Sequence, residues 1–388
     1  MTLRATLTSA LAGPLVKVRL AGVAAAALLF ASPAYGGAPP VSARAFLVVN
    51  PATGEVLAQH RAWTRVPIAS ITKLMTVLVA LDHTRWNDLV RVRADAADVG
   101  ESTINLRAGE RITVGDLVKA ALIQSANDAA DALADYVGHG DTDAFIKLMN
   151  AKAAELKLDR THFTRADGLD ARDHYSTALD VTRLAEMVMR DPRIRAVVRL
   201  RTDSIAGGRT LHTWNDLLGV FRGLYGVKTG HTASAGWCEV AAVHRGDVTL
   251  YTTVLGSPSR SQRNTDLASL LRWGISRYRP VWVVQPRRVY LRAAVGYGKK
   301  DVPIVALGGA VRPVRVDRPL VERVIAPAAL SLPVSRGERV GEVRVYSGKR
   351  LVVRRALVAD RAVARPSFGG RVGFYAGRTF HHIGSWFS

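Results

Sequence analysis

One short motif pairs a hydroxyl with an amine in a way that could attack a carbonyl group. Ser70-Ile71-Thr72-Lys73 places the serine three residues before the lysine, so both lie on one face of a predicted helix. A serine alcohol needs a base, and a lysine amine serves only if burial or a second cation lowers its pKa. The helix N-terminus adds partial positive charge beside a developing oxyanion. The motif predicts a serine nucleophile with a lysine base.

A second motif, Lys228-Thr229-Gly230, lies on a predicted strand. Lys228 would disfavour protonation of Lys73 and attract an anionic substrate. Thr229 can hydrogen-bond a carboxylate, and Gly230 lets a substrate backbone approach the strand closely. This motif predicts the anion-binding side of the same site.

A third motif, Ser125-Ala126-Asn127, lies between two predicted helices. Ser125 could relay a proton and Asn127 could hold a substrate amide. Each motif alone is common in chains of this length. Their order, with Ser-x-x-Lys opening an early helix and Lys-Thr-Gly on a late strand, is the signature of class A β-lactamases and penicillin-binding proteins.

The hydrophobic pattern predicts the elements that position these motifs. Helical periodicity covers Ala69–Asp82, Val114–Gln124, Asp128–Val137, Phe145–Leu156, Ala178–Met189 and Asp266–Ile275. Strands are predicted as a hairpin of Ala45–Val49 and Glu55–Gln59, followed much later by Tyr225–Lys228, Gly236–Val243 and Thr249–Leu255. After Pro280 the chain breaks into short runs rich in Val and Arg, which indicate a small antiparallel β domain.

Composition narrows the class of protein. The 388 residues are 48% hydrophobic and 22% charged, which excludes disorder, collagen and coiled coil as overall descriptions. A single cysteine excludes an intrachain disulfide framework and a cysteine-based zinc site. The net charge of +22 is uneven, because residues 281–388 hold 20 Lys and Arg against 6 Asp and Glu. The basic surplus therefore belongs mainly to the C-terminal segment.

Residues 44–278 resemble the low-molecular-mass penicillin-binding proteins, the serine-type D-alanyl-D-alanine carboxypeptidases of peptidase family S11. Besides the three motifs, the resemblance rests on several matching stretches, among them Pro67–Thr76, Asn127–Ala130, Met149–Ala153, Asp167–Leu169, Ser176–Ala178 and Lys228–Thr232. Ala126 and Lys157 stand where the family usually has glycine, and neither change removes a catalytic group. The resemblance implies an α+β transpeptidase-like catalytic domain, an antiparallel sheet flanked by helices plus a helical subdomain, followed by a small all-β domain.

The resemblance also implies a mechanism that removes the terminal D-alanine from peptidoglycan stem peptides. Ser70 attacks, Lys73 takes its proton, and Ser125 passes a proton to the leaving amine. Substrate binding falls to Asn127, Lys228, Thr229, Gly230, His231 and Arg263, with the backbone N–H groups of Ser70 and His231 forming the oxyanion hole. No metal or organic cofactor is needed. Cys238 is expected in the core, and Trp214 and Asn215 are expected to pack near the cleft.

The domain organisation predicted from the sequence has four parts. Residues 1–36 are a secretory signal, with Arg4, Lys17 and Arg19 before the apolar run Leu20–Ala31. Residues 37–280 form the catalytic domain, 281–370 the β domain, and 371–388 an amphipathic tail with a mostly apolar stripe opposite basic side chains. Such a tail is typical of helices lying on an anionic membrane. We therefore expect an exported enzyme at the extracytoplasmic face of a bacterial membrane.

Several alternatives stay open at this stage. A DD-endopeptidase would cut peptidoglycan cross-links with the same residues. A β-lactamase would need a carboxylate to activate the deacylating water, and the Glu-x-x-Leu-Asn pattern of class A enzymes is missing between the second and third motifs. A catalytically silent wall-binding protein would not need the intact motifs. Expected partners are stem peptides ending in D-Ala-D-Ala, β-lactams as covalent inhibitors and an anionic membrane surface, whereas nucleic acid is disfavoured by the export signal.

Overall fold

The computed structural model describes residues 25–28 and 37–384, which form two compact units. One unit runs from Ala34 to Tyr278 and contains all three motifs. The other contains the chain from Arg279 onward together with strand β1 (Ala25–Leu28). Each unit has its own hydrophobic core.

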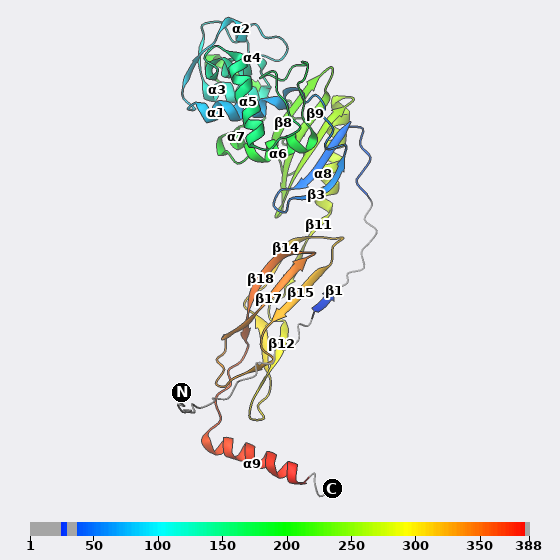
Figure 1. Ribbon diagram of the computed structural model, residues 1–388, viewed down its shortest axis with the longest axis vertical. Coiled ribbons are helices and arrows are strands. Elements are labelled where there is room, and N and C mark those ends of the chain that lie inside the picture. Colours follow the sequence, from blue (N-terminus) through cyan, green and yellow to red (C-terminus); the bar gives the residue numbers. More distant parts are fainter. Residues whose placement is uncertain (1–24, 29–36, 385–388) are drawn as a thin grey trace, which may run out of the picture. The chain divides into compact units, whose positions relative to one another are not determined.

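The motif-bearing unit is built on a five-stranded antiparallel sheet with the order β3-β2-β10-β9-β8 (Figure 1). The strands are β2 (Ala45–Asn50), β3 (Glu55–His60), β8 (Leu224–Thr232), β9 (Gly236–Arg245) and β10 (Val248–Ser257). The first hairpin falls where the two apolar-rich runs flanking residues 50–54 predict it. β8, which carries Lys-Thr-Gly, is an edge strand and can therefore face a substrate.

Alternating side chains of this sheet pack on helices at both faces. Val48, Ala241 and Leu250 belong to the core cluster under α8 (Arg260–Ser276). Leu47, Val240 and Leu255 belong to the larger cluster shared with the other helices. Successive strand residues point to opposite faces of the sheet, and helices cover both faces. A polar side chain on either face therefore lies inside the protein.

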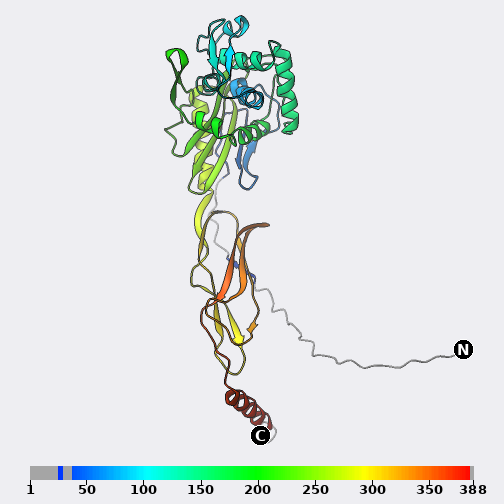
Figure 2. The same ribbon diagram turned by 90° about the vertical axis from the view of Figure 1, so that its left-hand side faces the viewer.

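The remaining helices belong to the same unit (Figures 1 and 2), and one of them, α6 (Ala178–Val188), packs against strands β2, β9 and β10. They are α1 (Lys73–His83), α2 (Ala94–Ala97), α3 (Val114–Lys119), α4 (Asn127–Val137), α5 (Thr142–Glu155), α6 (Ala178–Val188) and α7 (Pro192–Val197). Two ribbons accompany them, β4 (Leu89–Arg91) with β5 (Arg111–Thr113) and β6 (Thr202–Ile205) with β7 (Arg209–His212).

Two of the predicted helices change type along their length, and a third begins earlier than predicted. The helix expected from Ala69 begins as a 3-10 turn, Ala69–Thr72, and becomes α-helical only at Lys73. The helix expected over Val114–Gln124 changes after Lys119 into a π-helical turn. The helix expected from Asp266 begins at Arg260, because the Ser259 side chain accepts a hydrogen bond from the Gln262 N–H and caps it.

The second unit is a seven-stranded sheet, β1-β15-β17-β18-β13-β12-β16, with a β11–β14 pair. Its strands are β11 (Tyr278–Val284), β12 (Val289–Val295), β13 (Val302–Ala306), β14 (Ala310–Arg315), β15 (Leu320–Ile325), β16 (Ala329–Leu330), β17 (Arg339–Ser347) and β18 (Arg350–Ala359). Helix α9 (Phe368–Gly384) follows. The all-strand region predicted after Pro280 is therefore present.

The predicted leader and tail fall partly outside the described residues. Of the leader, Ala25–Leu28 is described, as strand β1 paired antiparallel with β15, and the rest of 1–36 lies outside. Of the predicted tail, 371–384 is helical within α9 and 385–388 lies outside. Among the described residues, no helix combines the length and apolarity needed to cross a bilayer.

Candidate active site

Lys73 is completely buried and points its amine at the Ser70 hydroxyl. Its ammonium donates three hydrogen bonds, to Ser70 Oγ (2.9 Å), Asn127 Oδ1 (2.6 Å) and the Asp167 carbonyl oxygen (2.6 Å). Burial lowers the pKa of Lys73 to about 8, against the opposing pull of nearby carboxylates, Asp167 first. A substantial fraction of the amine is therefore neutral near physiological pH.

The three acceptors around Lys73 also orient its neutral form. A neutral amine keeps two N–H donors and gains one lone pair. The Asn127 oxygen and the Asp167 carbonyl can only accept, so they retain the two N–H groups. Ser70 is the one partner of the three that can donate, so the lone pair is directed at its hydroxyl. The lone pair of neutral Lys73 thus faces the Ser70 hydroxyl, which is the geometry that a base for this serine would need.

Ser125 and Lys228 form a second hydroxyl–amine pair. The Lys228 amine donates to Ser125 Oγ (2.8 Å) and to the Thr229 carbonyl (2.9 Å). Burial holds the pKa of Lys228 well below its ordinary range, and the Lys73 charge lowers it further. Ser125 ends the π-helical turn in a left-handed conformation, with φ of 65°. That conformation stores strain at the residue whose hydroxyl faces Lys228.

Asn127 lies at the first residue of α4 rather than within a loop. Its Oδ1 accepts from Lys73, and its Nδ2 donates to the Gly100 carbonyl (2.9 Å). The amide orientation is thereby fixed, because only the oxygen can accept from the lysine. Asn127 also lines the pocket, so its amide lies between the Lys73 amine and the space that a substrate would fill.

Gly230 brings β8 against the turn that carries the nucleophile. A Cβ added at Gly230 would lie 2.9 Å from the Ile68 carbonyl oxygen and 3.0 Å from the Ser70 nitrogen. Real Cβ atoms do not approach backbone this closely, so the position requires glycine. The backbone N–H groups of Ser70 and His231 thereby come from two closely packed segments, whereas the His231 ring is exposed and stacks on Trp237, centroids 4.1 Å apart.

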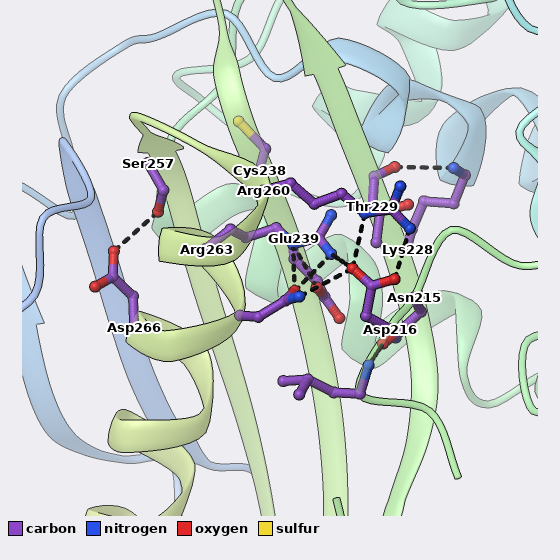
Figure 3. Close-up of polar contacts among 12 residues, drawn as sticks. Asn215, Asp216, Lys228, Thr229, Cys238, Glu239, Ser257, Arg260, Arg263 and Asp266 are labelled. Carbon is purple, nitrogen blue, oxygen red and sulfur yellow. Dashed lines mark hydrogen bonds and ion pairs between the residues drawn. The ribbon is translucent and has the colours of Figure 1, made fainter. Parts of the chain in front are cut away.

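Thr229 and Arg263 lie on the side of the pocket nearest α8, and Figure 3 shows the polar network behind them. Arg263 is within the helix, not on a loop before it, and is 1% exposed. Its Nη2 donates to Asp216 Oδ2 (3.0 Å) and Asn264 Oδ1 (2.7 Å). Behind it lies Glu239, fully buried on β9. The sequence offered no signal for this carboxylate.

These residues surround one pocket of about 240 Å³. Ser70, Ser125, Asn127, Thr229, Gly230, His231 and Arg263 line it, while Lys73 and Lys228 are buried beneath its surface. The pocket is also lined by Glu101, Ser102 and Trp237, for which the sequence predicts no role. Trp214 lines it as well, as expected from its position before Lys-Thr-Gly. In the described part of the chain, no group of three or more His, Cys, Asp or Glu side chains could hold a metal ion.

A buried histidine, for which the sequence predicts no role, contacts the turn Ala69–Thr72 that carries Ser70. His174 Nδ1 accepts from the Thr164 N–H (3.1 Å), so its Nε2 carries the proton and donates to Thr72 Oγ1 (2.8 Å). Burial lowers the pKa of His174 to about 4, so the ring stays neutral at pH 7. Thr72 and Lys73 are thus both tied to residues 164–174, a segment distant from them in sequence.

Comparison with known proteins identifies the family. The model for D-alanyl-D-alanine carboxypeptidase, peptidase family S11, matches residues 33–259, more than half of the chain. The chain belongs to this family. It is 33% identical to D-alanyl-D-alanine carboxypeptidase DacC of Escherichia coli K12, over 95% of this chain and 98% of that one. The family membership expected from the motifs is confirmed.

Solved structures show the same fold. The D-alanyl-D-alanine carboxypeptidase DacD of Francisella tularensis has a TM-score of 0.61 at 24% identity, covering 84% of this chain and 95% of that one. Penicillin-binding protein D2 of Listeria monocytogenes, in a cefotaxime-bound form, has a TM-score of 0.57 at 30% identity, covering 62% and 100%. The predicted α+β transpeptidase-like fold class is confirmed for this family member.

Proposed function

We propose that this protein is a serine-type carboxypeptidase that removes the terminal D-alanine from peptidoglycan stem pentapeptides through an acyl-enzyme on Ser70. The observation that carries the proposal is the Lys73 amine, whose two other partners leave its lone pair directed at the serine hydroxyl. Family membership supports the substrate class, since the family is named for this cleavage.

Acylation begins when Ser70 Oγ bonds to the carbonyl carbon of the penultimate D-alanine and its proton passes to Lys73. The carbonyl oxygen becomes an oxyanion, held by the backbone N–H groups of Ser70 and His231, each such donor contributing about 3–4 kcal/mol in the transition state. The C–N bond then breaks. Ser125 gives its hydroxyl proton to the departing amine and takes one from the Lys228 ammonium, to which it is hydrogen-bonded, and free D-alanine leaves.

Deacylation returns the enzyme to its starting state. Water adds to the ester carbon, and the proton that it loses passes through Ser125 to neutral Lys228. The bond to Ser70 Oγ breaks, and protonated Lys73 returns its proton to the serine oxygen. The products are the shortened stem peptide and free enzyme. The terminal carboxylate of the substrate would lie against Thr229, Arg263 and the Lys228 charge. A β-lactam would acylate Ser70 in the same way, in line with the cefotaxime-bound relative.

The location of the enzyme follows from its substrate and its C-terminal unit. A peptidoglycan substrate places the enzyme outside the cytoplasm, and residues 1–36 are the proposed export signal. Arg323, Arg344 and Arg354 are direct cross-strand neighbours on β15, β17 and β18. Like charges placed opposite one another destabilise a sheet. Glu342 on β17 pairs with Arg344 and Arg354, so three arginines share one carboxylate and keep a net positive charge. We propose that this row and α9 keep the enzyme at an anionic membrane surface.

Two measurements test the proposal. Fluorescent penicillin is expected to label the wild type covalently and to leave Ser70→Ala unlabelled, with Ser261→Ala, an exposed serine on α8, as the matched control. Labelling retained in Ser70→Ala would refute the acyl-enzyme. Incubation with a pentapeptide is expected to release D-alanine. Cleavage of a cross-linked dimer instead would indicate an endopeptidase, and rapid penicillin turnover a β-lactamase.

The membrane proposal has its own test. A chain that ends at Pro366 lacks α9 and is expected to lose most of its binding to sedimented vesicles of anionic phospholipid, while keeping its penicillin labelling. Full retention of vesicle binding by this truncated chain would refute a role for the helix.

A further inference from the structure

A buried carboxylate lies directly behind the proposed carboxylate-binding side of the pocket. In the sheet register, Glu239 on β9 is the partner of Thr229 on β8, so the two side chains point to the same face. That face is covered by α8, from which Arg263 enters (Figure 3). Glu239 is completely buried, and the mechanism above gives it no part.

The contact between Glu239 and Arg263 is an ion pair without an aligned hydrogen bond. Arg263 Nε lies 3.1 Å from Glu239 Oε2, yet neither carboxylate oxygen has a hydrogen-bond donor among the described residues. An unsatisfied buried carboxylate is costly to keep ionised. Burial accordingly raises the pKa of Glu239 to about 7, despite the opposing effect of the Arg263 charge. Both protonation states are therefore populated near neutral pH.

Arg263 is held in place by other groups besides Glu239. Its Nη2 binds Asp216 and Asn264, and Asp216 is itself clamped by Arg260 (2.8 Å). Arg263 also lines the pocket. Removing the charge of Glu239 therefore leaves the guanidinium in position, with its positive charge less compensated toward the pocket.

We propose that Glu239 is a positioning residue that tunes how strongly Arg263 attracts the terminal carboxylate of the substrate. This rests on the proposed function, because it assumes that a C-terminal carboxylate binds beside Thr229 and Arg263. Ionised Glu239 partly cancels the Arg263 charge, so the pocket binds the carboxylate more weakly. Protonated Glu239 does not cancel the Arg263 charge, so the pocket binds the substrate carboxylate more strongly.

The charged groups around Glu239 set the direction of the pH effect. Arg263 and Arg260 come from α8, Lys228 from β8, and Asp216 from the segment before β8. As pH rises through about 7, Glu239 ionises and carboxylate binding weakens. Lys228 loses charge as pH rises and acts in the same direction, so a variant is needed to separate the two.

The test compares two substrates that differ only in the C-terminal charge. One is a stem pentapeptide ending in D-Ala-D-Ala, and the other carries a C-terminal D-alaninamide. The ratio of their kcat/KM values cancels effects on the chemical step. Glu239→Gln removes the charge at nearly constant shape and is expected to raise this ratio about threefold to tenfold at pH 8, through KM. In the wild type the ratio is expected to fall between pH 6 and pH 8. In Glu239→Gln this fall should be smaller, because only the loss of charge on Lys228 still contributes to it.

A matched control removes a different buried carboxylate, that of Asp266 on α8. Asp266 accepts hydrogen bonds from Ser42 and from Ser257 (3.0 Å), away from the pocket. Asp266→Asn is expected to affect stability without moving the ratio. If Glu239→Gln does not fold, Glu239→Leu serves the same purpose, because an apolar residue of similar volume often replaces a buried ion without loss of stability.

The outcomes separate this inference from the proposed function. A ratio that rises in the Glu239 variant and not in Asp266→Asn supports it. An unchanged or lower ratio in a folded Glu239 variant overturns it, as does an equal rise in the control. A wild type that cleaves neither peptide would instead refute the carboxypeptidase proposal itself.

Discussion

The buried amine of Lys73 makes a quantitative prediction about pH. If its neutral form is the base for Ser70, the acylation rate must follow the fraction of neutral amine. With a pKa of about 8, roughly 1% of Lys73 is neutral at pH 6 and about half at pH 8, so acylation is expected to rise about 50-fold between them. Above pH 9 the rate should level off.

The assay is stopped-flow acylation by a fluorescent penicillin from pH 5.5 to pH 10. Rate constants are taken at saturating penicillin, so that changes in carboxylate binding by Lys228 do not enter. Lys73→Arg, which stays charged throughout, is expected to show neither the rise nor appreciable acylation. A rate that is flat between pH 6 and pH 8, or that still increases tenfold per pH unit above pH 9.5, would refute the assignment of Lys73 as a base with a lowered pKa.

Three further predictions concern stability and packing. Because the folded pKa of Lys73 lies below its ordinary 10.5, only the unfolded chain holds that proton between about pH 8 and pH 10.5, and stability rises with pH there. The unfolding free energy of the wild type minus that of Lys73→Met, from urea titrations, should increase by about 2.5 kcal/mol from pH 7 to pH 10, and a constant difference would contradict this. Gly230→Ala is expected to lose about 100-fold in kcat/KM while its circular dichroism stays native, because the new Cβ separates β8 from the Ser70 turn; activity within twofold of the wild type would argue against that packing. Phe145→Ala removes a fully buried ring of α5 and should cost about 3–5 kcal/mol by the same titrations, with a loss below 1 kcal/mol counting against the packing described.

Predictions from the sequence were most accurate where the interacting residues lie close together in the chain. Ser70 and Lys73 are three residues apart, so one turn of helix suffices to bring them together. The ordering of the three motifs then indicated the family, and the family implied the fold. The hairpin at residues 45–60 also follows from local signals, because two short apolar-rich runs flank the turn residues 50–54, and strand β2 is buried at all of its positions.

The parts of the site that were missed depend on contacts between distant segments. The carbonyl that holds Lys73 comes from Asp167, and no residue type predicts the use of a backbone oxygen. Glu239 was missed because a charged residue in a strand normally indicates an exposed face, and here α8 covers that face. The π-helical turn before Ser125 was missed because its residues, Ala120–Gln124, have ordinary helical propensity.

The left-handed backbone at two active-site positions sets a limit on how this enzyme can be improved. Ala69, just before the nucleophile, has φ of 51°, and Ser125 has φ of 65°. Non-glycine residues in this region cost on the order of 1 kcal/mol each, and they adjoin two lysines whose charged forms are disfavoured by burial. Substitutions that relieve the strain at Ser125, or the cost of burying Lys73 and Lys228, would alter the candidate active site as well. Directed evolution of this enzyme toward thermostability therefore needs a simultaneous screen for catalysis.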